Sequence, residues 1–184
     1  MTDTLVHPDY RVGTWNLDTA HSELSFTVKH LRVTKVRGTF DKFDVTIVTA
    51  EDPAQTTVVA TVDVGSVNTK QEMRDNHLRT SDFFKVDEHP TMTYRSTSIQ
   101  FDGDDFAVEG ELTLRGVTQP VTLKGELGGV ITMDDGTVKA GASATGKINR
   151  HDFGVSWNSA LEAGGMTLGD DVTINMDLEV VLDQ

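Results

Sequence analysis

The 184-residue chain has 16 basic and 29 acidic residues, which give it a formal net charge of −13. Nucleic acids and anionic membrane surfaces are bound through an excess of lysine and arginine, so this charge argues against both as partners. Apolar residues make up 37% of the sequence, enough for one buried core. No window approaches the roughly 18 consecutive apolar residues of a membrane-spanning helix.

The first twelve residues form an N-terminal extension that contains two acids, Asp3 and Asp9, and no apolar run or small-residue cleavage site. This is unlike a secretory signal, so we expect a cytoplasmic protein. The chain has no cysteine, which excludes disulfides and thiolate metal sites. A β-barrel of roughly 200 residues is commonly one domain, so we expect residues 1–184 to form a single domain.

Alternation of apolar and polar residues with a period of two, the pattern of a strand with one buried face, recurs eight times. The first run covers 24–30. The second, 36–47, changes parity near Asp41 and Lys42, which predicts a bulge or bend there. The remaining runs cover 58–64, 92–101, 106–114, 121–127, 138–148 and 172–182.

Turn residues separate several of these runs. The stretches Asp102-Gly103-Asp104-Asp105 and Asp134-Asp135-Gly136-Thr137 are typical of hairpins, because glycine and aspartate tolerate positive φ angles. Short connections make successive strands antiparallel neighbours. We therefore predict an all-β fold, an eight-stranded antiparallel barrel that closes on itself and leaves no sheet edge exposed.

Two segments interrupt the strand pattern. Thr69 and Glu72 have the spacing of a capping box, which predicts a short helix over about 70–79 with Asp75 and Arg79 paired. A run ending in two glycines predicts one further helical turn near 159–164.

The seventh strand predicts an internal cavity. Its inward face carries Ala140, Ala142, Ala144 and Gly146 where core strands usually carry larger residues. An eight-stranded barrel has just enough interior to fill with side chains or to hold one small ligand. The facing aromatic and methionine side chains could equally fill the space, since protein interiors are close-packed.

The candidate polar and lid residues also have two interpretations. His30 is the last residue on the apolar face of the first strand. It is either a hydrogen-bonded core residue or a residue that contacts the headgroup of a ligand. Phe83 and Phe84, just after the predicted helix, would cover one barrel end as a fixed plug or as a lid over the cavity. No nucleophile elbow, phosphate loop or paired metal-binding histidines occur, so we expect neither catalysis nor a bound metal.

Several blocks of residues carry a family pattern over about Gly13 to Leu182. They read Trp15-x-Leu17-Asp18-x-x-His21-Ser22-x-Leu24-x-Phe26, Arg74-Asp75-x-His77-Leu78-Arg79-x-x-Asp82-Phe83-Phe84 and Ile148-Asn149-Arg150-x-Asp152-Phe153-Gly154. In this order they resemble the YceI-like family, whose fold is an extended lipocalin-like barrel. The resemblance implies that a long polyisoprenoid or similar amphiphile binds in the barrel, without established catalysis. It also implies pairing into a homodimer.

The ligand expected from this resemblance is a polyisoprenoid, an isoprenoid-quinone tail or a fatty acyl chain, with no other cofactor. Many relatives are exported to the periplasm, whereas this chain shows no export signal. The candidate ligand contacts are Trp15, Phe26, His30, Phe40, Arg74, His77, Leu78, Phe83, Phe84, Tyr94, Phe101, Ala142, Ala144 and Met176. Two rival functions stay open: a filled barrel acting as a stress-related interaction module, and an enzyme using His30 with Asp82 or Arg74.

Overall fold

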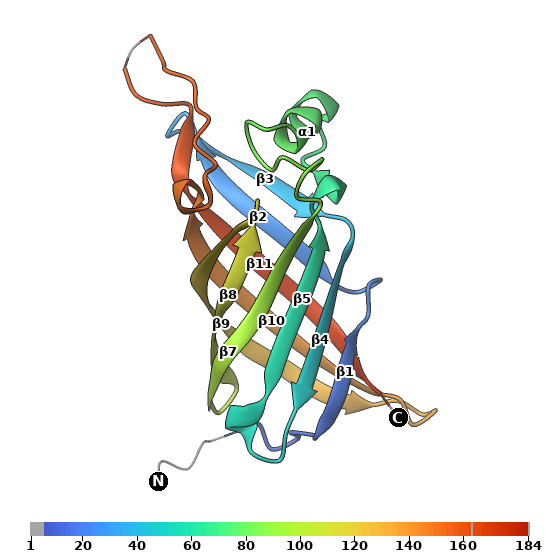
Figure 1. Cartoon of the computed structure of the whole chain (residues 1–184). Coiled ribbons are helices and arrows are strands. Elements are labelled where there is room, and N and C mark those ends of the chain that lie inside the picture. The colour runs from blue at the N-terminus through green and yellow to red at the C-terminus, as the bar shows by residue number, and fades with distance from the viewer. Residues whose placement is uncertain (1–5, 163, 184) are drawn as a thin grey trace.

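Antiparallel strands dominate the structure, a computed structural model that describes residues 6–162 and 164–183. The predicted all-β fold and eight-stranded antiparallel barrel are confirmed (Figure 1). The strands are β1 (Gly13–Leu17), β2 (Glu23–His30), β3 (Thr34–Phe40), β4 (Phe43–Thr49), β5 (Thr57–Asp63), β6 (Val67–Asn68), β7 (Thr91–Asp102), β8 (Asp105–Leu114), β9 (Val117–Thr132), β10 (Val138–Asn149) and β11 (Leu168–Leu182). One α-helix, α1 (Glu72–Arg79), and three 3₁₀ turns, η1 (Pro53–Gln55), η2 (Val64–Ser66) and η3 (Arg150–Phe153), complete the described elements.

The sheet closes on itself. Around the barrel the strands follow the order β1-β4-β5-β7-β8-β9-β10-β11, and β11 then pairs with β1. Toward the N-terminal end of β11, β2 takes the place of β1 as the neighbour of β11. There β3 pairs with β2. Successive strands lie side by side, as the short predicted connections require.

Three of the eight barrel strands consist of two elements each. Residues 18–22 separate β1 from β2, Asp41 and Lys42 separate β3 from β4, and η2 separates β5 from β6. The break between β3 and β4 lies where the sequence pattern changes parity, so the predicted bend is confirmed. It lets one long strand pair with β5 below the bend and with β6 above it.

The two ends of the barrel differ. Helix α1, the β2–β3 hairpin and residues 155–162 and 164–167 gather at one end, which we call the upper end (Figure 1). The start of β1 and the end of β11 lie toward the other, lower end. The buried core runs between them and includes Phe26, Phe40, Val62, Met92, Tyr94, Leu112, Leu123 and Phe153.

Helix α1 starts two residues later than predicted. Gln71 is its N-cap, because the Gln71 side chain accepts a hydrogen bond from the Arg74 N–H. Thr69 donates its N–H and its hydroxyl to the Asp75 carboxylate, at 2.8 and 2.5 Å, so it is not the capping residue that the sequence suggests. This buried pair fixes the start of the helix to the strand before it.

The predicted ion pair between Asp75 and Arg79 is wrong. Arg79 donates instead to the backbone carbonyls of Gly65 and Val67, at 2.9 and 3.1 Å. The Asp75 carboxylate accepts its hydrogen bonds from Thr69. The guanidinium therefore fastens α1 to the end of the β5–β6 strand, and this contact is not visible in helical spacing.

The predicted helical turn near 159–164 is a reverse turn. Ala160 and Met166 form an antiparallel bridge, and the Gly164 N–H donates to the Leu161 carbonyl at 2.9 Å. Gly164 and Gly165 both have positive φ angles, which a tight turn requires and a helix does not accept. Ala163 lies outside the described residues.

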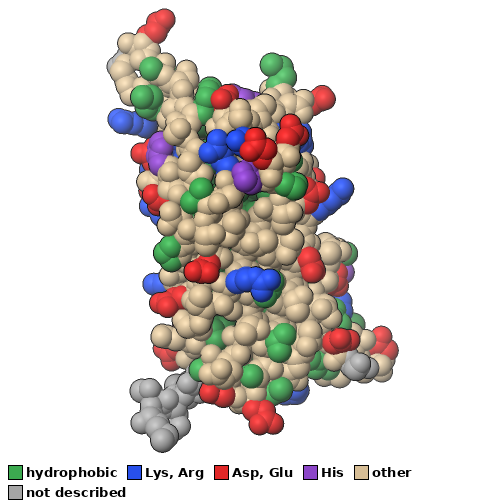
Figure 2. Space-filling model, in the orientation of Figure 1, with side chains coloured by type: hydrophobic (Ala, Val, Ile, Leu, Met, Phe, Trp, Pro, Cys, Tyr) green, Lys and Arg blue, Asp and Glu red, His purple; other side chains and the backbone are tan. Residues whose placement is uncertain are grey.

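Charged side chains are spread over the outer wall. Figure 2 shows acidic and basic groups interspersed on one face, without a large area of either sign. Of the exposed large apolar side chains, Leu31, Val33, Met73 and Met166 belong to the segments at the upper end. Within the described residues, no helix has both the length and the apolar character needed to cross a membrane.

Candidate ligand-binding site

A cavity of about 530 Å³ opens at the upper end of the barrel. This volume lies within the range of about 300–1,000 Å³ typical of small-molecule sites. Strands β2, β3 and β11 form one wall, and α1, the residues after it and the segment after η3 form the opposite side. Its apolar lining includes Leu24, Phe26, Val28, Phe40, Leu78, Phe83, Phe84, Met92, Leu114, Ile148, Val172 and Ile174.

A second, smaller void of about 110 Å³ lies below the upper cavity. Leu24, Met92 and Ile174 line both spaces, so the two spaces adjoin at these three side chains. The lower void is otherwise lined by side chains of the barrel middle, among them Tyr94, Phe106, Ala142, Ala144 and Met176. The interior space therefore has a wide part at the upper end and a narrow part in the middle of the barrel, and these two chambers adjoin at the three shared side chains.

Most of the predicted contacts line one of the two chambers. The upper cavity is lined by Phe26, His30, Phe40, Arg74, His77, Leu78, Phe83 and Phe84. The lower void is lined by Tyr94, Ala142, Ala144 and Met176. Their contact with a ligand stays a prediction.

Two predicted contacts, Trp15 and Phe101, line neither chamber. The Trp15 indole N–H donates to the Thr49 hydroxyl at 3.0 Å, which holds the ring in the lower core. Phe101 lies near the end of β7 and packs edge-on against Tyr10, with ring centroids 6.1 Å apart. Tyr10 comes from the N-terminal extension, a contact that strand periodicity cannot reveal.

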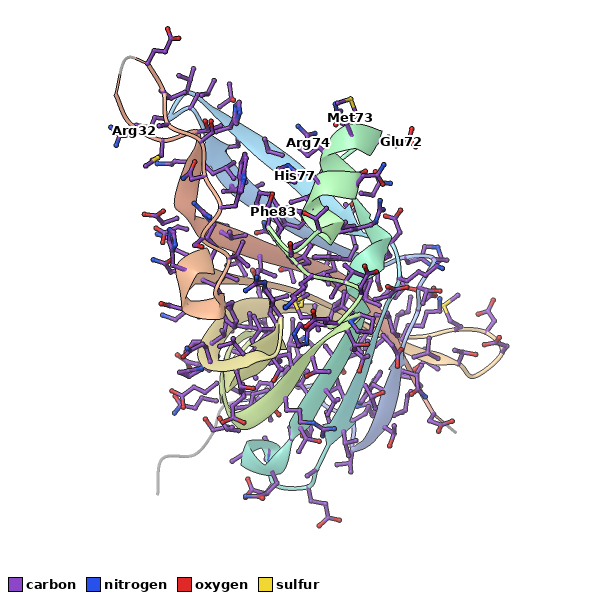
Figure 3. The ribbon with its side chains drawn as sticks, turned by 45° about the horizontal axis from the view of Figure 1, so that its top comes forward. Arg32, Glu72, Met73, Arg74, His77 and Phe83 are labelled. Atoms are coloured by element: carbon purple, nitrogen blue, oxygen red, sulfur yellow. The ribbon has the colours of Figure 1, made fainter. Side chains whose placement is uncertain are left out.

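The mouth of the upper cavity carries an aromatic cluster of His77, Phe83 and Trp157. The centroid of the His77 ring lies 5.0 Å from that of Phe83 and 4.8 Å from that of Trp157, both in edge-on geometry. In Figure 3, His77 and Phe83 lie on the barrel side of α1, whereas Glu72 projects away from the barrel. The cluster therefore joins the α1 segment to the segment after η3 across the mouth.

Hydrogen bonds hold the His77 side of this cluster in place. His77 Nε2 lies 2.8 Å from the Asp82 carboxylate. Arg115 donates to the carbonyls of Ser81 and Gly154, both at 2.9 Å, and so bridges the two segments beneath the mouth. Phe84 packs inward on Phe40, with ring centroids 5.8 Å apart.

Arg150 is a buried cation in the cavity wall, with only 5% of its surface exposed. Its Nε donates to the Gly169 carbonyl at 2.9 Å, and its Nη1 donates to those of Val155 and Trp157 at 2.9 and 2.8 Å. Burial lowers the pKa of this guanidinium from its ordinary value, while Asp170 acts in the opposite direction. The arginine anchors the backbone of the mouth segment to the start of β11.

Arg150 and Trp157 were not among the predicted contacts. Arg150 belongs to one of the residue blocks of the family pattern, so a signal for it exists in the sequence. Trp157 follows in a stretch without periodicity, and only the folded chain brings it to α1. Strand alternation cannot identify a contact between a helix and an irregular segment.

Among the residues that line the lower void, Tyr94 has a shifted pKa. Burial raises the pKa of its phenol to about 12, and the charge of Glu109 acts in the same direction. The hydroxyl donates to the carbonyls of Val108 and Val121, at 3.2 and 3.0 Å. Tyr94 is therefore a neutral structural hydrogen-bond donor at physiological pH.

One cluster has the residue types of a metal site. Asp18, His21 and Glu179 place ligand atoms within 4.8 Å of one another. The Lys139 ammonium already lies 3.1 Å from Asp18 Oδ2 and 2.7 Å from Glu179 Oε1. A cationic side chain thus holds the position a metal would take, and the cluster is better described as an ion-pair network.

Comparison with known proteins identifies the family. The sequence profile of the YceI-like domain matches residues 15–180. The chain belongs to the YceI-like family. A UPF0312 protein of Staphylococcus aureus strain N315 is 41% identical over 167 residues, which cover 90% of this chain and 95% of that protein. The resemblance seen in the sequence is confirmed.

Solved structures share this YceI-like fold. The YceI protein of Campylobacter jejuni is 33% identical, with a TM-score of 0.73 over 91% of this chain and 97% of that one. BcnA of Burkholderia cenocepacia is 23% identical, with a TM-score of 0.77 over 89% and 98% of the two chains. A domain from Saccharophagus degradans described as polyisoprenoid-binding is 18% identical, with a TM-score of 0.66 over 94% and 100%. The last two likenesses support the barrel fold alone.

Proposed function

We propose that this YceI-like protein binds one long apolar chain in its barrel and sequesters or carries it. The observation that carries the proposal is the upper cavity, about 530 Å³ of mainly apolar lining that opens at one end of the barrel. A polyisoprenoid, an isoprenoid-quinone tail or a fatty acyl chain fits this lining. The Saccharophagus degradans neighbour, which shares the barrel fold, is described as polyisoprenoid-binding, and we extend this class of ligand to the present barrel as part of the proposal.

The affinity would come mainly from buried apolar area. Burial of one CH₂ group contributes about 0.8 kcal/mol, so a chain of about fifteen carbons gains enough to offset the cost of ordering it and to bind with several kcal/mol net. The distance along the wall suits such a chain, because β2 runs six residues from Leu24 to His30, or about 20 Å at about 3.3 Å per residue.

Lipid extraction and native mass spectrometry of the purified protein test the proposal. We expect one apolar chain per barrel in the parent and loss of this ligand in Val172→Trp, because Val172 lines the upper cavity on β11. The matched control is Thr173→Trp, on the same strand but outside both chambers. Equal occupancy in the two variants, or no ligand in any folded sample, contradicts the proposal and favours the filled-barrel interaction module.

We propose a non-catalytic role for the same site. The sequence suggested His30 with Asp82 as an acid–base pair, but Asp82 hydrogen-bonds His77 instead. The histidine–carboxylate pair at the cavity is therefore His77 with Asp82. Hydrolysis of a prenyl or acyl ester that disappears in His30→Ala or His77→Ala would establish the enzyme alternative.

Pairing into a homodimer is a further part of the proposal. It rests on the family resemblance and is independent of the cavity. Sedimentation equilibrium of the purified protein measures the mass directly, and a monomer at all concentrations would remove this part while leaving ligand binding intact.

A further inference from the structure

The β2–β3 hairpin is basic in a protein that is otherwise strongly acidic. Residues 24–40 include Lys29, Arg32, Lys35 and Arg37 and no acid, although the whole chain has 29 acidic residues. Arg37 forms an ion pair with Glu23, at the start of β2. The side chains of the other three have neither an ion pair nor a hydrogen bond within the described part of the chain, and we call them the free hairpin cations.

Two of the free hairpin cations face each other. Lys29 and Lys35 are register partners on neighbouring antiparallel strands, and both are exposed. Like charges directly opposite one another destabilise a sheet. A groove of about 400 Å³ on the outer wall is lined by Lys29 and Arg32, and its acid, Asp170, already lies 2.8 Å from His151 Nε2. The hairpin thus presents positive charge that no acid of its own balances.

The tip of the hairpin is a tight turn built from unusual residues. The Val33 N–H donates to the His30 carbonyl at 3.1 Å, and Leu31 and Arg32 between them have φ angles of 54° and 59°. Turns with two positive φ angles favour asparagine and glycine, because other side chains are strained there. Backbone strain of this kind collects at functional sites. The turn leaves Val33 82% exposed beside the cations.

Exposed apolar side chains also border the cavity mouth. Met73, in the first turn of α1, is 79% exposed, and Met166 is 53% exposed. In Figure 3, Arg32 and Met73 lie at the upper end on opposite sides of His77 and Phe83, which line the cavity at its mouth. The upper end therefore combines unpaired cations and exposed apolar side chains around an opening into an apolar cavity.

We propose that the upper end of the barrel docks on the surface of an anionic phospholipid bilayer. The free hairpin cations bind the headgroup phosphates, and Val33 and Met73 enter the boundary between headgroups and acyl chains. The position of the mouth favours a bilayer over a protein partner, because an apolar chain could then enter the cavity without crossing water. Docking goes beyond the proposed function, since it uses only the outer surface and does not require a chain in the barrel.

The net charge of −13 is compatible with this contact. Most of the acids lie on the barrel wall, and exposed charges farther apart than about 8 Å are largely screened at physiological ionic strength. The repulsion expected from the net charge therefore acts on the wall more than on the hairpin. Glu72 and Glu162 are exposed acids at the upper end and oppose docking, so Glu72→Gln with Glu162→Gln should bind anionic vesicles more tightly than the parent.

Sedimentation of the full chain with lipid vesicles tests the docking. One set of vesicles is phosphatidylcholine alone, and the other is an equal mixture of phosphatidylcholine and phosphatidylglycerol. We expect the mixed vesicles to bind at least about tenfold more tightly, because each lysine or arginine near an anionic surface adds to the attraction. This preference should disappear at high salt.

Variants locate the contact. Replacement of the three free hairpin cations by glutamine should abolish the preference for mixed vesicles. A control with the same net charge removes exposed cations elsewhere on the barrel and should keep the preference: Arg11→Gln, Lys42→Gln and Lys124→Gln. Val33→Ser should weaken binding to both kinds of vesicle, whereas Ile131→Ser, on an exposed residue of β9 toward the lower end, should not. Thermal melts confirm that each variant is folded.

The outcomes separate this proposal from chain binding. Equal binding of the parent to the two kinds of vesicle, or equal binding of the hairpin variant and its charge-matched control, overturns docking and leaves chain binding in the cavity standing. Self-association that is lost in Val33→Ser, without vesicle binding, would make the tip a contact between copies of the chain and also overturn docking. Vesicle binding by a protein that takes up no apolar chain supports docking and contradicts the proposed function.

Discussion

Glycines opposite large side chains determine how much of the barrel interior is filled. A Cβ added to Gly146 would lie 2.6 Å from Leu123 Cδ2, and one added to Gly125 would lie 2.5 Å from Phe106 Cζ. The small residues of β10 and its neighbours thus make room for side chains of the facing strands. Only part of the space predicted beside Ala142 and Ala144 stays open, as the lower void of about 110 Å³.

Gly110→Ala tests this close packing. The new methyl group would lie 2.5 Å from Tyr94 Cζ and 2.6 Å from the Arg95 carbonyl oxygen, so both the Tyr94 ring and the strand must shift. Overpacking of this kind costs about 1–3 kcal/mol of unfolding free energy, measured by urea denaturation. The control is Gly141→Ala, whose added Cβ would meet its nearest atom at 3.9 Å. Equal unfolding free energies of the two variants would contradict the prediction, because they would show that the Tyr94 ring and the strand move aside without a measurable cost.

At the scale of elements, the upper mouth is assembled from helix α1 with the residues after it and from the irregular segment after η3. The residues around α1 supply His77 and Phe83, and the segment after η3 supplies Trp157. Helix α1 has eight residues, too short to be stable alone, so tertiary contacts must hold it. A segment held by a few side-chain contacts can open without unfolding the barrel. We therefore expect the cluster to act as a lid that controls ligand exchange.

Trp157→Ala should speed release of a bound chain while leaving its equilibrium occupancy close to that of the parent. The substitution removes the ring contacts to His77 and Phe83 that join the two segments. Stopped-flow transfer of a fluorescent fatty acid to vesicles measures the rate. Phe40→Leu is the control, because Phe40 lines the cavity wall on β3 but does not join the two segments. Similar rates in parent and Trp157→Ala would make the α1 segment a fixed plug.

The sequence predicts the elements well where one physical rule governs each residue. Alternation of period two defines the barrel strands, and the parity change at Asp41 and Lys42 defines the bend between β3 and β4. The prediction that Thr69 caps the helix was wrong, because Thr69 hydrogen-bonds the Asp75 carboxylate in a buried contact. Helical spacing does not reveal this contact. Of the residues at the mouth, only those of the α1 side could be predicted. Trp157 lies in a segment whose sequence has no alternation of apolar and polar residues.

At the scale of the whole molecule, the barrel closes along a seam on β11, which pairs with β2 over most of its length and with β1 at its C-terminal end. β1 pairs with β11 over three register positions, from Trp15↔Leu182 to Leu17↔Val180. Beyond β1, Lys139 of β10 binds both Asp18 and Glu179, at 3.1 and 2.7 Å. The ion-pair network thus joins three neighbouring barrel strands at the point where the sheet closes.

Asp18 makes the stability of this seam dependent on acid pH. Hydrogen bonds from His21 and then from Lys139 hold the pKa of Asp18 well below its ordinary value of 3.8. The unfolded chain therefore takes up the proton first as the pH falls. The stabilisation by ionised Asp18 is present above about pH 4 and is lost as the pH falls through the lowered pKa of the folded state.

Asp18→Asn should therefore destabilise the protein most at neutral pH and progressively less below pH 4, measured as the difference in urea midpoint from the parent at each pH. Differences between variants are needed because other acids of the chain also titrate in this range. Asp177→Asn is the control, since Asp177 is an exposed acid on β11 without an ion pair among the described residues. Its midpoint should follow the parent at every pH. A difference in urea midpoint between Asp18→Asn and the parent that stays constant from pH 7 to below pH 4 would contradict this prediction. It would mean that the Asp18 charge makes no net contribution, and that strand pairing and the bond between Lys139 and Glu179 stabilise the seam.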